Sequence, residues 1–147
     1  MFPKNIAIVI FHDNKNIILQ KRGPHSKVGE KYGFFGGKIK KGENSNQAIK
    51  RELTEELGFI PRELIFWTKH SFIIQEGKYN DLKIILHIFL SPITKKLQTA
   101  KVLEGNGMIK STISQILSGK KFDKYDKKIF KKFKNFLKTN YSQSSKE

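Results

Sequence analysis

The strongest constraint on this chain is a concentration of acidic residues between Gly37 and Phe59, in the stretch GKIKKGENSNQAIKRELTEELGF. The 147 residues include 29 Lys and Arg but only 13 Asp and Glu, and the net charge is +16. Four of those 13 acids nevertheless fall within 14 residues of one another: Glu43, Glu52, Glu55 and Glu56. Carboxylates gathered in this way in so basic a chain indicate a common purpose.

The same segment is predicted to be a helix from Asn44 to Leu57. Asn44 is a favourable N-cap, because its side-chain oxygen can accept from a free amide, and Gln47 completes a capping-box pattern. Gly58 follows as a residue that readily ends a helix. Apolar residues recur at every fourth position and form a narrow stripe that can pack on a core: Ile49, Leu53 and Leu57.

Three of the acids would form a strip along the edge of this helix. At 100° per residue, Glu52, Glu55 and Glu56 fall within an arc of about 100°. Like charges at this spacing cost about 0.2–0.5 kcal/mol per pair, and Arg51 offsets only part of the repulsion. A hard divalent cation would offset the rest, because Mg²⁺ binds carboxylate oxygens and keeps waters that phosphates can replace. The alternative is an ordinary solvated acidic face.

A longer pattern favours the first explanation. Gly37 is followed after five residues by Glu43 and after seven more by RELTEELGF, which ends at Phe59. This arrangement fills every constrained position of the signature GX5EX7REUXEEXGU, in which U is a bulky apolar residue. The chain therefore resembles the Nudix hydrolases, and the resemblance implies that the carboxylates hold a metal ion.

The resemblance also implies a fold of the α/β class. The expected Nudix fold is an α/β/α sandwich with a central mixed β-sheet, in which the signature forms a loop, a helix and a second loop. Alternating and β-branched runs predict strands at 5–11, 16–22, 64–74 and 82–90, the first two joined in a hairpin, and helices at 111–117 and about 123–138. We expect one hydrolase domain over 1–139 and a polar tail over 140–147.

The resemblance implies a set of metal ligands. Mg²⁺ is the expected ion, with Mn²⁺ as the alternative. The implied ligands are the Gly36 carbonyl and the carboxylates of Glu52, Glu55, Glu56 and Glu104, the last from VLEGNGM. Glu104 has the alternative of an ordinary loop surface residue. The catalytic general base stays open between Glu52 and Glu55, with Glu104 as a third candidate.

Four residues of the signature are expected to be structural. Arg51 is expected to orient the glutamates through ion pairs, and Glu43 to brace the loop before the helix. Gly37 is expected to permit a close backbone approach, and Gly58 to end the helix in the left-handed conformation.

Outside the signature, the chain resembles the MutT-type branch of the family. The similar segments are IAIVIFHDNKNIILQKRG, KYGFFGGKIKKGE and FDKYDKKIF. The second has Phe35 where the branch most often has proline. The substrate-binding residues implied or suggested are Arg22, Lys38, Phe34, Phe35, Tyr79 and Asp126, with Phe72 as a further aromatic candidate. The alternatives are solvated charges for the two basic residues, core packing for the aromatic ones and a favourable first-turn acid for Asp126.

The resemblance implies Mg²⁺-dependent hydrolysis of a nucleoside diphosphate linked to a further group. The favoured substrate is a nucleoside triphosphate such as 8-oxo-dGTP, cleaved to the monophosphate and pyrophosphate. The proline that marks ADP-ribose hydrolases is absent near Ile73 to Gln75. Two alternatives stay open: an RNA 5′-pyrophosphohydrolase or RNA-binding Nudix protein, and a catalytically silent nucleotide sensor.

Composition bounds the partners. A charge of +16 suits anionic partners such as nucleotides, with nucleic acid less favoured, although a solvated lysine-rich surface is the simpler explanation. The absence of cysteine excludes disulfides and a thiol nucleophile, and it fits the expected cytoplasmic location. No apolar run reaches the roughly 18 residues of a membrane span, so no membrane partner is expected. The sequence leaves open whether the protein is a monomer or a homodimer.

Overall fold

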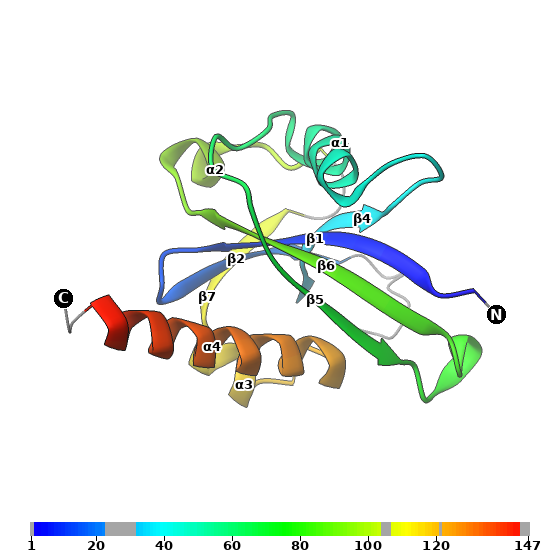
Figure 1. The fold of residues 1–147 in the computed structure, drawn as a ribbon. Coiled ribbons are helices and arrows are strands. Elements are labelled where there is room, and N and C mark those ends of the chain that lie inside the picture. The colour runs from blue at the N-terminus through cyan, green and yellow to red at the C-terminus, as the bar shows by residue number, and fades with distance from the viewer. Residues whose placement is uncertain (1, 23–31, 104–106, 121, 145–147) are drawn as a thin grey trace.

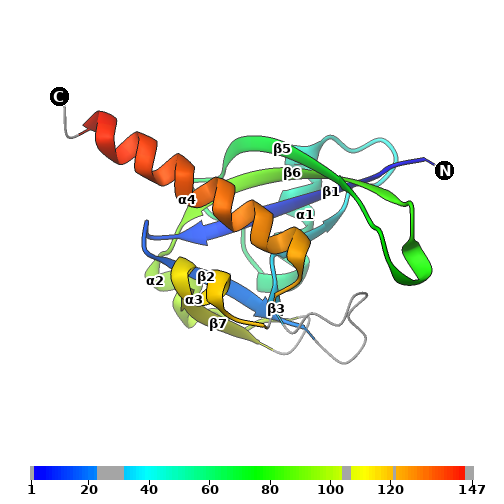
Figure 2. The same ribbon diagram turned by 90° about the horizontal axis from the view of Figure 1, so that it is seen from below.

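The computed structural model describes residues 2–22, 32–103, 107–120 and 122–144. A seven-stranded sheet forms the middle layer, with α1 and α2 on one face and α3 and α4 on the other (Figure 1). Figure 2 shows α4 lying across the strands, with α3 beside it. The layers are those expected for an α/β/α sandwich, so the predicted fold class is confirmed.

The sheet is mixed. Its order is β3-β2-β1-β6-β5, with β4 pairing with β1 and β7 pairing with β2. β1 and β6 run parallel, whereas the other pairs are antiparallel. The strands are β1 (Lys4–His12), β2 (Asn16–Lys21), β3 (Tyr32–Gly33), β4 (Phe35–Lys38), β5 (Ile65–Ile73), β6 (Lys83–Pro92) and β7 (Met108–Thr112).

The helices are α1 (Ser45–Leu57), α2 (Lys95–Thr99), α3 (Ile113–Ser118) and α4 (Lys124–Ser144), with a 3₁₀ turn η1 (Gly77–Tyr79). The predicted limits of α1 are confirmed: Asn44 and Gln47 form a complete capping box, and Gly58 has φ 80°. Sequence patterns did not predict α2 or β7. α4 continues to Ser144, beyond its expected end at Lys138. The division into a domain over 1–139 and a tail over 140–147 stays a prediction.

Two hydrophobic cores cover the two faces of the sheet. Because side chains alternate along a strand, β1 contributes to both. Ala7, Val9 and Phe11 join the core under α1, whereas Ile8 and Ile10 join the core under α4. β1 also shares one edge between two partners: residues 6–9 pair with β4, and residues 11 and 12 pair with β2. This sharing holds the Gly36–Gly37 pair of β4 beside the centre of the sheet.

Candidate active site

The site begins where α1 packs against β4. Glu56 is 4% exposed, and its Oε1 accepts a hydrogen bond from the Gly36 amide at 2.9 Å. Gly36 has φ 139°, and a Cβ there would strike the Ala7 carbonyl of β1. A side chain at position 36 is therefore excluded by both space and backbone conformation. The glycine brings the β4 backbone close to β1 and under a buried carboxylate.

A second carboxylate of α1, that of Glu52, lies against the next residue of β4, Gly37. A Cβ built at Gly37 would clash with the carboxyl group of Glu52. The close approach expected at Gly37 is thus present, and the group that approaches is an acid. Glu52 and Glu56 are one turn apart on α1, so their side chains lie on one face of the helix. The carboxylates of Glu52 and Glu56 therefore lie against the backbone of the adjacent residues Gly37 and Gly36.

Arg51 joins the loop before α1 to the acids of the helix. Its Nε and Nη2 donate to the two oxygens of Glu43 at 2.7 and 3.0 Å, a two-pronged pair. Its Nη1 lies 2.8 Å from Glu52 Oε1 and 3.4 Å from Glu55 Oε1. Its Nη2 also donates to the Lys38 carbonyl at 2.9 Å. The expected ion pairing of Arg51 with the glutamates is confirmed.

The electrostatics of this network fix its charge state. The hydrogen bonds from Arg51 and from the Lys40 amide lower the pKa of Glu43 from 4.5 to about 2. The hydrogen bond to Glu43 raises the pKa of Arg51 above its ordinary value. Both groups are charged throughout the physiological range. Glu43 therefore braces the loop at 40–43 against α1, as expected from the sequence.

The chemistry of the donors fits a hard divalent ion. Glu52 and Glu56 offer carboxylate oxygens against the glycine backbone of β4, and oxygen ligands are those that Mg²⁺ and Mn²⁺ accept. Within the described ranges, no three His, Cys, Asp or Glu side chains stand close enough to hold a metal together. Arg51 instead neutralises Glu52, and Glu55 is 41% exposed at its side chain. Glu104 lies outside the described residues.

A cavity on the α4 face of the sheet gathers most of the predicted substrate residues. Its described lining includes Arg22, Phe34, Tyr79 and Asp126, together with Phe72. Its volume of about 170 Å³ lies below the 300–1,000 Å³ typical of sites that enclose a whole small molecule. The cavity therefore suits one ring system, with the rest of a ligand outside.

The aromatic walls of this cavity are held in place by stacking. Phe34 stacks on Phe130 with ring centroids 5.0 Å apart, and Phe72 stacks on Tyr125 at 4.5 Å. The Tyr125 hydroxyl also accepts from the Gln75 amide at 2.9 Å. The rings are therefore both core residues and walls, so the two alternatives weighed for the aromatic residues coexist.

Charged groups stand at the same cavity. Arg22 donates to the Phe34 carbonyl at 3.3 Å. Lys4 and Asp123 also line the cavity, and sequence reasoning did not single them out. Asp123 could have been recognised from its position, because it precedes α4 and accepts from the Asp126 amide at 2.7 Å, as an N-cap does. Lys4 carries no such signal.

Two predicted substrate residues lie elsewhere. Phe35 has 0% exposure and packs edge-on against Phe11, on the α1 face of the sheet. The expectation that it stacks on a base is wrong, because alternation along the chain turns it away from Phe34. Lys38 is exposed at the end of β4 and is not among the residues that line the cavity.

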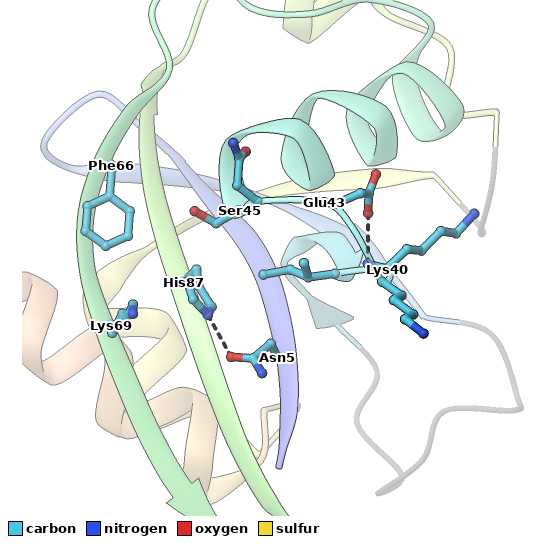
Figure 3. A pocket seen from close by; sticks show the side chains of 10 residues that line it. Asn5, Lys40, Glu43, Ser45, Phe66, Lys69 and His87 are labelled. Atoms are coloured by element: carbon cyan, nitrogen blue, oxygen red, sulfur yellow. Dashed lines mark hydrogen bonds between the residues drawn. The ribbon is translucent and has the colours of Figure 1, made fainter. Parts of the chain in front are cut away.

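A larger hollow of about 610 Å³ lies at the beginning of α1 (Figure 3). Its floor carries His87, which is paired with Asn5 at 2.9 Å, and its walls include Phe66 and Lys69. Glu43 borders it, but the acids at positions 52, 55 and 56 do not. The volume of a cavity therefore does not identify the catalytic site. The candidate site comprises the carboxylate cluster, which is formed by Glu52, Glu55 and Glu56, and the cavity on the α4 face.

Comparison with known proteins agrees with this geometry. The family model described as the NUDIX domain matches residues 1–128. The chain therefore belongs to the Nudix family. This family is the one that the sequence signature led us to expect.

Two curated relatives share the name 8-oxo-dGTP diphosphatase. The protein of Escherichia coli K12 is 36% identical over 61 residues, which are 42% of this chain and 47% of the relative. That of Buchnera aphidicola from Acyrthosiphon pisum is 44% identical over 57 residues, 39% of this chain and 42% of the relative. The chain thus spans about half the length of the curated relatives it matches.

Solved structures share the fold over most of the chain. The MutT protein of Methanosarcina mazei Go1 has a TM-score of 0.72 at 18% identity, over 90% of this chain and 94% of that one. The E. coli ORF135 protein has a TM-score of 0.65 at 23% identity, over 90% and 89%. At these identities the likeness shows the fold.

Among the described residues, none of the helices has the length and apolar character to cross a membrane.

Proposed function

We propose that this protein hydrolyses a purine nucleoside triphosphate, with 8-oxo-dGTP as the favoured substrate, to the monophosphate and pyrophosphate, with Mg²⁺ as cofactor. The observation that carries the proposal is the closure of Glu52 and Glu56 on the backbone of Gly37 and Gly36. The two curated relatives named 8-oxo-dGTP diphosphatase support the choice of substrate.

The surroundings of each carboxylate indicate whether it would bind the metal or act as the general base. Glu52, Glu56 and the Gly36 carbonyl would hold the metal, with Glu55 beside them. When bound, the metal neutralises phosphate charge and lowers the pKa of water. Glu55 is our choice of general base, because it is the more exposed acid and touches Arg51 only at 3.4 Å or more. Glu52, held by Arg51 at 2.8 Å, is less free to move toward water.

The cavity on the α4 face is proposed to receive the base. Phe34 and Phe72 offer apolar ring walls, and Arg22, which also lines the cavity, is proposed to contact a phosphate oxygen. Asp126 and Asp123 offer carboxylate oxygens, which accept from N–H groups on a guanine edge. In this proposal the base and the phosphates would lie on the two faces of the sheet, linked by residues 34–37, because Phe34 lines the cavity while Gly36 and Gly37 meet the acids.

The experiment is an assay of product formation with Mg²⁺ over a panel of substrates. The panel contains the standard dNTPs, 8-oxo-dGTP, ADP-ribose, diadenosine tetraphosphate and a 5′-triphosphate RNA, with Glu55→Gln as the blank. Preferential conversion of 8-oxo-dGTP to its monophosphate supports the proposal. Preference for the RNA, or no turnover of any triphosphate, contradicts it.

A further inference from the structure

The solvent face of α4 carries a row of lysines that the proposed site does not use. We define the lysine stripe as the exposed residues Lys124, Lys128, Lys131, Lys132 and Lys138. At 100° and 1.5 Å per residue, these side chains fall within an arc of about 120° and extend over about 21 Å. The stripe therefore follows one side of the helix, with the exposed Asn135 between Lys132 and Lys138.

The charges of the stripe are poorly compensated. Lys128 stands three or four positions from Lys124, Lys131 and Lys132, spacings at which like charges repel by about 0.2–0.5 kcal/mol per pair. Within the described part of the chain, the stripe's recorded ion pair joins Lys124 to Glu76 at 3.8 Å, with both side chains more than half exposed. Such a pair contributes little. The stripe thus retains a strong positive field.

A partly buried histidine on β5 lies near these charges. His70 lies on the α4 face of the sheet, opposite Leu86, and its Nε2 is buried without a hydrogen-bond partner among the described residues. Burial, followed by the charges of Lys132 and Lys128, lowers its pKa. His70 is therefore mostly neutral at neutral pH and does not add to the positive charge of the stripe.

The composition of the lysine stripe indicates which class of partner it fits: a lipid surface, a protein or a nucleic acid. Where the burial of α4 is described, its opposite face is buried through Ile129, Phe130 and Phe133, so these apolar residues are not available to a lipid bilayer. Protein interfaces favour aromatic residues and arginine and are poor in lysine, whereas the stripe is lysine alone. A row of lysines without such anchors matches a linear array of phosphates.

We propose that the lysine stripe of α4 binds the phosphate backbone of nucleic acid without reading its sequence. The first turn of α4 also lines the cavity, through Asp126, so a bound strand would lie next to the proposed site. The proposal does not depend on the hydrolysis of any nucleotide, because backbone binding requires neither the cavity nor the carboxylate cluster.

The test is the binding of a fluorescein-labelled 20-nucleotide single-stranded RNA with a 5′-hydroxyl, followed by anisotropy in EDTA between 50 and 200 mM salt. The variant combines Lys128→Ala, Lys131→Ala and Lys138→Ala. The matched control combines Lys50→Ala, Lys83→Ala and Lys95→Ala, which removes the same charge from exposed lysines of α1, β6 and α2. Thermal unfolding of both variants verifies that they fold.

We expect the stripe variant to bind at least tenfold more weakly at 50 mM salt. The slope of log K against log salt should become shallower by about 2, because each lost phosphate contact removes about 0.7 for a single strand. The control should change affinity less than twofold. Equal losses in both variants would overturn the proposal and assign binding to net charge. Equal competition by poly-glutamate, or binding to anionic vesicles in preference to RNA, would also overturn it.

Discussion

At the scale of single residues, one arginine holds the signature together. Arg51 touches three of the four clustered acids and the Lys38 carbonyl, so a single guanidinium joins β4, the loop at 40–43 and α1. The planar fork of arginine suits this task better than lysine would. In the ion-free protein, Arg51 supplies the positive charge that limits repulsion among the acids.

Glu55→Gln is expected to lower kcat by at least about 10²-fold, in the range of losing one positioned acid–base group. The side chain is 41% exposed, so its substitution should leave folding intact. Steady-state rates with 8-oxo-dGTP, beside a thermal melt of the same sample, provide the measurement. Near-full turnover would remove Glu55 as the base and leave Glu52 as the remaining candidate within the described residues.

Glu43→Gln is expected to change how stability depends on pH. The pKa of Glu43 is about 2 in the folded protein and 4.5 for the unperturbed group, so its ionised form stabilises the fold. Because the folded pKa is depressed, this contribution is full above pH 4.5 and is lost as the pH falls toward 2. Melting temperatures between pH 2 and 7 should fall less steeply with acid in the variant. An unchanged acid limb would contradict the assignment.

Sequence reasoning at this scale succeeded where a spacing rule applied. The roles of Arg51, Gly37 and Gly58 follow from fixed offsets along one helix and its two flanking loops. Phe35 was misjudged because two adjacent aromatic residues give no indication of which one faces the α4 side. Only the register of β4 on β1, with Phe35 opposite Val9, assigns it to the core under α1.

At the scale of elements, α1 and its two ends determine where the acids stand. The capping box at Asn44 fixes the start of the helix, and the left-handed Gly58, whose amide donates to the Thr54 carbonyl, fixes its end. With both ends set, the apolar stripe packs on the sheet and the acids turn toward β4. These local signals made α1 the most predictable element in the chain.

Asn44→Ala is expected to lower the free energy of unfolding by about 1 kcal/mol, the usual cost of losing an N-cap side chain. Its side chain accepts from the Gln47 amide at 2.8 Å, and no alanine can replace that bond. Urea unfolding provides the measurement. Asn46→Ala, at an exposed position of the same turn, is the control and should change stability by less than half as much. Similar losses in both variants would contradict the capping role.

The short elements were not predicted from the sequence because tertiary contacts, and not local sequence patterns, stabilise them. β7 forms five residue pairs with β2, and those contacts are distant in sequence. α2 is a five-residue helix capped by Thr94, too short to show a periodic apolar pattern. The α4-side cavity could not be located from sequence for the same reason. It draws on β1, β5, β6 and α4, and no local pattern reveals the order of these strands in the sheet or the face that α4 covers.

At the scale of the whole molecule, the two faces of the sheet carry different functional groups. The α1 face carries the acids, and the α4 face carries the ring-lined cavity and the lysine stripe. Three of the 13 acids therefore lie close together on α1, whereas the chain as a whole has a net charge of +16. A metal ion at the acids would reverse the local sign there and leave the whole molecule attractive to anions.

Mg²⁺ is expected to raise the melting temperature of the wild-type protein, because a ligand that binds only the folded state stabilises it by about 2.7 kcal/mol at 100 times its Kd. The combined variant Glu52→Gln/Glu56→Gln should lose this response. Melts in EDTA, Mg²⁺ and Mn²⁺ provide the measurement, with Glu63→Gln, an exposed acid outside the cluster, as control. An undiminished response in the double variant would place the metal elsewhere.

The most direct test of the central claim is the rate of pyrophosphate release from 8-oxo-dGTP by the wild-type protein, with Mg²⁺ and with EDTA. Glu52→Gln and the control Glu63→Gln are assayed alongside. We expect metal-dependent release with equimolar 8-oxo-dGMP, a loss of at least about 10²-fold in Glu52→Gln and none in Glu63→Gln. Equal release in EDTA, or by Glu52→Gln, would contradict the claim that the acids of α1 form the active site.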